Sequence, residues 1–148
     1  MSATDLFAAV RNHEAIRYMD KRRGHRFVPP KADTRKVPDL YATGDAPMRD
    51  ATIWLHYFAG GCDWWIAELG APEVLDDGTV SWRAFGYACL GDPGLAEWGT
   101  TDLFDLATTL VPIGTVRGAV IRNAVERDCY WTPAPAAECI PILRHRAG

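Results

Sequence analysis

Several features that would assign the chain to a familiar class are missing. Its four cysteines lie far apart, and none forms the C-x-x-C pair that closes a structural zinc site. No apolar run approaches the ~18 residues needed to cross a bilayer, and residues 1–15 lack the basic and then apolar layout of a secretory signal. We therefore expect a cytoplasmic protein that contacts no membrane, binds no metal and keeps its thiols reduced and mostly buried. A disulfide or a metal cluster is the alternative.

Signatures of common enzymes are also missing. The sequence contains no G-x-S-x-G, P-loop, H-E-x-x-H or glycine-rich nucleotide motif. His56 and Glu68 lie on neighbouring predicted strands, but the register given below places them on opposite faces, which argues against a catalytic dyad. Structural roles are also predicted for the three other histidines, which are His13 on an apolar helix face and His25 and His145 in basic segments. We predict no catalytic residue and no cofactor, and we lean against an enzyme.

Aromatic and β-branched residues are concentrated in the middle of the chain. Most of the six tryptophans lie in runs between Thr52 and Trp98, and Gly60-Gly61 separates two of these runs. Because two glycines tolerate the positive φ angles of a tight turn, the pattern predicts a β-hairpin. The predicted cross-strand pairs are Tyr57 with Trp64, Leu55 with Ile66 and Ile53 with Glu68.

Both faces of this hairpin are apolar. The face opposite the pairs named above holds Trp54, His56, Phe58, Trp65 and Leu69. An antiparallel sheet with one wet side would alternate between apolar and polar residues. Either helices cover both faces, or one face is an interaction surface.

The remaining elements follow from periodicity and turn residues. A first helix, capped by Ser2 or Thr4 with Asp5 in its first turn, is predicted to run to about Arg22. A third strand, Val80 to Leu90, follows the turn at 76–78. A second helix is predicted to begin at a Thr100 or Thr101 cap, to carry Asp102 in its first turn and to end at Pro112. Alternation over residues 125–131 predicts a last strand.

We therefore predict a single α+β domain over residues 1–148, about the size that one core supports. Its small, mainly antiparallel sheet has three to five strands and is flanked by an N-terminal helix and the second helix. Residues 1–36 form a helical and basic extension, residues 37–133 the sheet-plus-helix core, and residues 134–148 a tail.

The net charge of −3 hides a division along the chain. Residues 17–36 hold eight Lys and Arg against two Asp, whereas residues 63–105 hold nine Asp and Glu against one Arg. An acidic body suits docking to a basic protein surface, and the alternative is solvated charge that serves solubility. The predicted partner-binding acidic surface comprises Glu73, Asp76, Asp77, Asp92 and Glu97. The predicted nucleic-acid or partner contacts are Lys21, Arg22, Arg23 and Arg26.

Five short motifs carry a resemblance. They are residues 38–43 (Pro-Asp-Leu-Tyr-Ala-Thr), Trp64-Trp65 with Glu68, Phe85-Gly86-Tyr87, the helix entry at 99–103, and Glu126-Arg127-Asp128 with Trp131. Over about residues 37–133 the chain resembles a bacterial domain family of unknown function carried on plasmids, phages and other mobile elements. It departs from the family pattern at 94–99. The resemblance implies an α+β fold, in neighbourhoods that include antirestriction and DNA-transfer proteins, and it supplies no catalytic residue.

Three functions remain open. The favoured hypothesis is a non-catalytic interaction protein of a mobile element that inhibits a host defence or nucleic-acid-processing complex, in the manner of antirestriction or anti-CRISPR proteins. Its partner would be a host protein or ribonucleoprotein complex. The alternative is an accessory protein that binds single-stranded nucleic acid. The third is an unrecognised hydrolase or nuclease that uses Glu68, Asp128 or His56. The sequence does not specify the oligomeric state.

Overall fold

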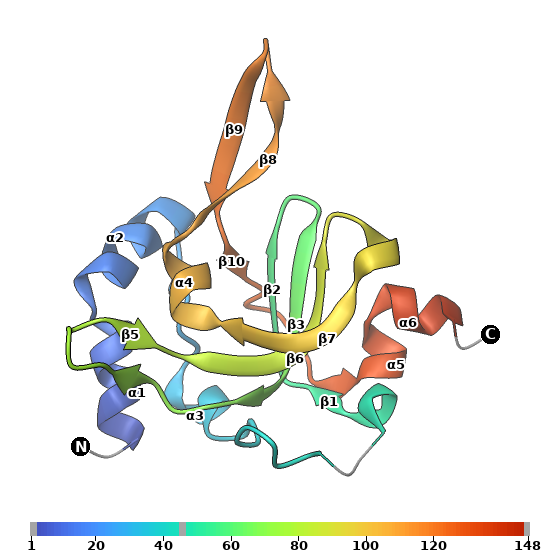
Figure 1. Ribbon diagram of the computed structural model, residues 1–148, viewed down its shortest axis with the longest axis horizontal. Helices are drawn as coiled ribbons and strands as arrows, with labels where there is room; N and C mark the ends of the chain where they lie inside the picture. The colour runs from blue at the N-terminus through green and yellow to red at the C-terminus, as the bar shows by residue number, and fades with distance from the viewer. Residues whose placement is uncertain (1–2, 45–46, 147–148) are drawn as a thin grey trace.

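A five-stranded antiparallel sheet forms the centre of the protein (Figure 1). The structure is a computed structural model that describes residues 3–44 and 47–146. The strand order is β10-β2-β3-β6-β7, and all neighbours are antiparallel. These strands are β2 (Leu55–Ala59), β3 (Cys62–Leu69), β6 (Arg83–Leu90), β7 (Glu97–Asp102) and β10 (Glu126–Arg127). The predicted α+β fold with a mainly antiparallel sheet of three to five strands is confirmed.

Helices cover both faces of the sheet (Figure 1). The helices that flank it are α1 (Ala3–Arg11), α2 (Glu14–Arg23), α4 (Leu103–Thr108), α5 (Ala136–Cys139) and α6 (Pro141–Arg146). One core contains Val10, Ile16 and Leu103 from α1, α2 and α4. The other core contains Ala136 of α5 and Leu143 of α6. Coverage by helices thus explains why both faces of the predicted hairpin are apolar, and the segment predicted as a tail contributes to the second core.

Smaller elements complete the chain. They are α3 (Lys31–Thr34), the 3-10 turns η1 (Met48–Asp50) and η2 (Pro93–Leu95), and three strand pairs: β1 (Thr52–Ile53) with β11 (Ala134–Pro135), β4 (Glu73–Val74) with β5 (Val80–Ser81), and β8 (Leu110–Val116) with β9 (Ala119–Ala124). None of the helices in the described part of the chain combines the length and apolar character that crossing a membrane requires. All four cysteines are free in this structure. They were predicted to be mostly buried, but Cys89 alone is fully buried.

The register of the central hairpin agrees with the prediction up to Ile66. Leu55 pairs with Ile66 and Tyr57 with Trp64. A β-bulge between Ile66 and Glu68 then shifts the pairing of β3 with β6, so that Glu68 lies opposite Phe85. Because a bulge inserts one residue, the side chains beyond it change face. Glu68 therefore lies on the face of Trp65 and His56, not on the opposite face as predicted.

Two further predictions for this hairpin fail. Ile53 pairs with Ala134 in the β1–β11 pair and not with Glu68. Leu69 belongs to the core that contains Leu55, although the prediction placed it on the face of His56. The two-residue alternation was carried through the bulge in the case of Leu69, and through the break at Trp54 between β1 and β2 in the case of Ile53.

Gly86 has the closest backbone neighbour among the glycines of the described residues. A Cβ atom built there would lie 1.9 Å from the carbonyl oxygen of Trp65 on β3. Gly99, its partner on β7, has open space at the equivalent position. Gly86 is therefore required for β3 and β6 to pair as they do.

The N-terminal helix is divided in two. The predicted helix to Arg22 stops at Arg11, and α2 begins after His13, whose Nδ1 accepts a hydrogen bond from the Ala15 N–H at 3.1 Å. His13 thus caps the new helix. The predicted cap at Ser2 lies outside the described residues, as do the side chains of Thr4 and Asp5.

The predicted second helix is shorter than expected. Residues 97–102 form β7, and Asp102 is the N-cap of α4, accepting hydrogen bonds from the N–H groups of Phe104 and Asp105. A carboxylate that reaches two N–H groups is a better cap than the predicted threonines, whose β-branched side chains suit the strand. α4 ends at Thr108, and the residues up to 116 form β8 instead of more helix.

Candidate functional site

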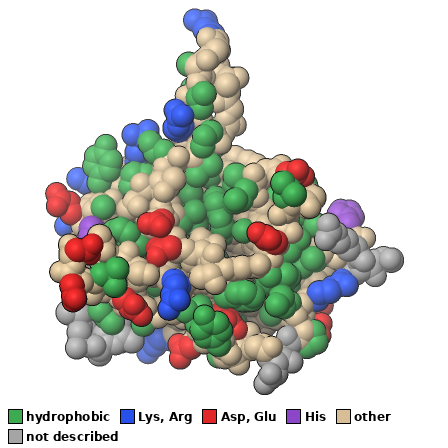
Figure 2. Space-filling view, viewed as in Figure 1, with side chains coloured by type: hydrophobic (Ala, Val, Ile, Leu, Met, Phe, Trp, Pro, Cys, Tyr) green, Lys and Arg blue, Asp and Glu red, His purple; other side chains and the backbone are tan. Residues whose placement is uncertain are grey.

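The β8–β9 pair, residues 110–124, projects from the body as an arm (Figures 1 and 2). At its tip Arg117 and Gly118 both have positive φ, +51° and +80°, as a two-residue primed turn requires. Every residue from Ile113 to Asn123 is exposed, and the apolar side chains among them include Val116, Val120 and Ile121. In the described residues β8 and β9 pair only with each other. The arm therefore presents apolar side chains and two open strand edges to solvent.

The foot of the arm rests on the central hairpin. Ile113 is the extra residue of a bulge between Pro112 and Gly114. A Cβ atom added to Gly60, which has a φ of +55° in the β2–β3 turn, would lie 2.8 Å from Cγ2 of Ile113. Ile113 therefore packs directly over Gly60. No prediction from the sequence included the arm.

Positive charge continues from the body onto the arm. β9 contacts α2, on which Arg17, Lys21 and Arg22 are exposed. From Leu106 to Val125 the chain carries Arg117 and Arg122 and no Asp or Glu. In the view of Figure 2 the arm accordingly bears basic and apolar side chains without a carboxylate.

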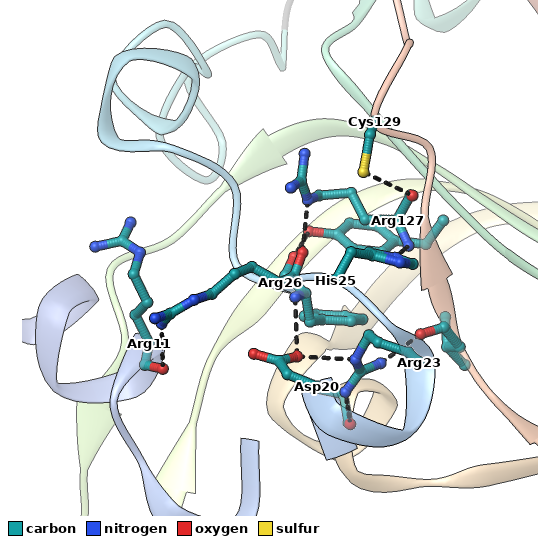
Figure 3. A network of polar contacts seen from close by, with 11 residues as sticks. Arg11, Asp20, Arg23, His25, Arg26, Arg127 and Cys129 are labelled. Atoms are coloured by element: carbon teal, nitrogen blue, oxygen red, sulfur yellow. Dashed lines mark hydrogen bonds and ion pairs between the residues drawn. The ribbon is translucent and has the colours of Figure 1, made fainter. Parts of the chain in front are cut away.

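Arg23 of the predicted basic contact is not available to a ligand. Its guanidinium is buried and donates hydrogen bonds to the backbone oxygens of Ala107 and Val125 and, at 2.9 Å, to the carboxylate of Asp20 (Figure 3). Burial lowers the pKa of Arg23, and the Asp20 carboxylate opposes that effect. Lys21, Arg22 and Arg26 are exposed as predicted. The prediction is therefore wrong for Arg23, which fastens α2 to α4 and to the end of the arm.

His25 also has a structural role, and hydrogen bonds hold its segment against Arg127. Its Nε2 accepts a hydrogen bond from the backbone N–H of Arg127 at 2.9 Å, and the Arg127 guanidinium donates to the Arg26 carbonyl (Figure 3). Because Nε2 must accept, this contact requires a neutral ring. Burial lowers the pKa of His25, while nearby Glu126 opposes the shift.

The five predicted acidic residues are all exposed but do not form one surface. Glu73, Asp76 and Asp77 lie in the β4–β5 hairpin, near the start of β6. Asp92 lies just beyond the other end of β6, and Glu97 on β7 pairs with Ala88 near that end. Since a strand rises ~3.3 Å per residue, the five steps from Arg83 to Ala88 place Glu97 roughly 16 Å from the start of β6, and Asp92 lies farther along. The carboxylates therefore form two separate groups.

The structure brings together one histidine and two aspartates. His56 Nε2 lies 2.8 Å from Asp63 Oδ1, and His56 Nδ1 lies 3.2 Å from Asp128 Oδ2. The imidazole stacks on Trp65, with ring centroids 5.4 Å apart and planes 10° apart. A general base needs a free nitrogen, and both nitrogens of this ring face a carboxylate. The two carboxylates therefore orient the imidazole and connect β2 to β3 and to the segment after β10.

Sequence reasoning could have found half of this cluster. Trp65 pairs with His56, so Asp63, two residues earlier, is a diagonal neighbour on the same face. Asp128 follows the two-residue strand β10, and its N–H donates to the His56 carbonyl at 2.9 Å. No pattern in the sequence indicates that pairing, because it depends on a segment 72 residues away.

Glu68 is buried and accepts hydrogen bonds from the loop before β1. Its Oε1 accepts a hydrogen bond from the Tyr41 N–H at 2.8 Å, and its Oε2 accepts from the N–H and hydroxyl of Thr43. Burial by itself would raise the pKa of this carboxyl, but the three hydrogen bonds together lower it. Within the described ranges, no three His, Cys, Asp or Glu side chains are grouped so as to hold a metal ion.

Comparison with known proteins adds no relative. No family model, no curated protein and no solved structure matches this chain.

Proposed function

We propose that this protein acts by binding a macromolecular partner through the β8–β9 arm. The observation that carries the proposal is the exposure of Val116, Val120 and Ile121 on a ribbon whose two edges are open. An isolated two-stranded hairpin is marginally stable in water, and an open apolar edge invites pairing with another chain. A partner that covers the arm would stabilise the hairpin and remove its apolar side chains and open edges from water.

We further propose that the partner is a host defence or nucleic-acid-processing complex, which the protein inhibits as an antirestriction or anti-CRISPR protein would. The separation of charge supports this choice. The arm and α2 present Arg117, Arg122 and Arg22 without a neighbouring carboxylate on the arm, whereas Asp76 and Asp92 lie in exposed loops of the body. A nucleoprotein complex presents both phosphates and a basic protein surface, so it can complement both regions.

A direct test uses the arm and a matched surface site. Val116→Asp combined with Val120→Asp places charge on both faces of the arm, because these residues lie on opposite faces of the ribbon. Leu95→Asp is the control, since Leu95 in η2 is 77% exposed and lies off the arm. In quantitative pull-down from the native host, we expect the arm variant to lose the partner complex and the control to retain it. Equal recovery by both variants, with both folded, would contradict the proposal.

A second candidate function is direct binding of single-stranded nucleic acid. The contact between α2 and β9 favours it, because that contact places exposed cations of both elements on one side of the molecule. Fluorescence polarisation with a labelled single strand tests it. Binding that weakens with added salt and disappears in Arg117→Glu with Arg122→Glu supports this function. Undetectable binding by the unaltered protein at low salt excludes it.

A further inference from the structure

A cavity of about 180 Å³ lies between the sheet and the loop that holds Glu68. Its walls include Tyr41, Met48, Glu68, Phe85, Trp98 and Thr100. This volume is below the roughly 300–1,000 Å³ of sites that enclose drug-sized ligands. The cavity is therefore suited to a head group and not to a whole cofactor.

Aromatic rings form much of its wall. Phe85 of β6 and Trp98 of β7 stack with ring centroids 6.0 Å apart and planes 18° apart. Tyr41 stands at the loop side with a positive φ of +68° and a largely exposed ring. The faces of such rings carry partial negative charge and attract a cation placed over them.

Glu68 places a full negative charge at the same cavity. Its side chain is 3% exposed, and among the described residues no Lys, Arg or His lies within ion-pairing distance of it. Among the described residues, its Oε1 accepts one hydrogen bond, from the Tyr41 N–H. A buried charge is normally compensated by a partner of opposite sign. The described part of the chain supplies hydrogen bonds to this carboxylate but no cation.

We propose that this cavity binds a methylated ammonium group, with Phe85, Trp98 and Tyr41 against the methyl shell and Glu68 as the counter-charge. An unmethylated ammonium has three N–H donors that each need an acceptor. The wall offers the Glu68 carboxylate and the Thr100 hydroxyl, but most of it, including Met48, Phe85 and Trp98, is apolar. Methylation removes those donors and leaves a cation with an apolar surface. The inference is independent of the arm and of the partner proposed above.

Two natural sources share this chemistry, namely a trimethyllysine side chain of a protein and free choline. Isothermal titration should therefore use tetramethylammonium, choline and a short trimethyllysine peptide, together with its unmethylated counterpart. The charge control is 3,3-dimethylbutanol, a neutral isostere of choline. We expect the cations to bind and the neutral isostere to bind at least roughly tenfold more weakly. The tighter of choline and the trimethyllysine peptide identifies the source.

Variants connect the binding to the cavity. Trp98→Leu and Glu68→Gln should each weaken tetramethylammonium binding by roughly tenfold or more, whereas Tyr130→Ala, which removes a 95% exposed ring elsewhere, should not. If Glu68→Gln does not fold, Trp98→Leu still tests whether the ligand binds in the cavity, because this variant leaves Glu68 and its hydrogen bonds in place. No binding at millimolar ligand, equal binding of the neutral isostere, or unchanged binding in Trp98→Leu would overturn the proposal.

Discussion

Strands β3 and β9 are both rich in apolar residues, yet they have opposite environments. Six consecutive residues of β3 are buried, whereas five of the six residues of β9 are exposed. β3 has a strand on each edge and a core on each face, whereas β9 has one neighbouring strand in the described structure. Strand formation depends on local sequence, but burial depends on what the rest of the chain brings to the strand. The body therefore satisfies its own apolar surface, and the arm does not.

The largest effect expected within the body comes from Gly86→Ala. The added Cβ would collide with the Trp65 backbone, so we expect loss of at least ~3 kcal/mol or failure to fold. Gly99→Ala, on the adjacent strand with open space, is the matched control and should change the free energy of unfolding by less than ~1 kcal/mol. Urea unfolding measures both. Similar losses for the two variants would show that the sheet is not as tightly paired as described.

The same substitution in the body and in the arm gives the next comparison. Ile66 is 1% exposed in β3, and Ile121 is 38% exposed in β9. Ile66→Ala should cost ~2–5 kcal/mol, as large-to-small core changes do, and Ile121→Ala less than ~1 kcal/mol. Chemical denaturation of both variants provides the values. A cost for Ile121→Ala close to that of Ile66→Ala would mean that the arm packs against something in the free protein.

A smaller effect on the free energy of unfolding is expected from protonation of His25, at the edge of the body from which the arm departs. The pKa of His25 is lower in the folded state than its ordinary value, so the unfolded chain binds more protons and stability increases with pH. The contribution is fully present above the ordinary histidine pKa of about 6.5 and is lost as the pH falls through the folded value. Thermal unfolding between pH 7.5 and 5 should show this decline. His25→Gln, which keeps a hydrogen-bond acceptor, should reduce this loss of stability at low pH. If the variant loses as much stability as the unaltered protein over this range, the role given to His25 is wrong.

Much of the body could be predicted because its signals are local. The Gly60-Gly61 turn fixed the pairing of Leu55 with Ile66, since a tight turn and a two-residue period determine register together. The bulge before Glu68 has no such signal, so every face assignment beyond it was reversed. β7 was missed because Asp102, the true cap, lies next to threonines that can also cap a helix.

The arm was missed for a different reason. Its turn is Arg117-Gly118, and arginine is uncommon at positive φ, so the usual hairpin signal of Asn-Gly or Asp-Gly is absent. The apolar residues up to Leu110 also continued the helical spacing of α4. Among the candidate site residues, exposure was predicted well. Their grouping and the burial of Arg23 depend on tertiary contacts that local patterns do not record.

The central claim, that the uncovered arm is the contact element, is tested most directly by site-specific photo-crosslinking in the native host. A photoreactive amino acid at position 116, near the arm tip, is compared with one at position 95, an apolar position on the body that is more exposed (77% against 58%). We predict that position 116 crosslinks to a subunit or nucleic acid of a processing or defence complex, and that position 95 does not. Crosslinking from position 95 with none from position 116 would contradict the account.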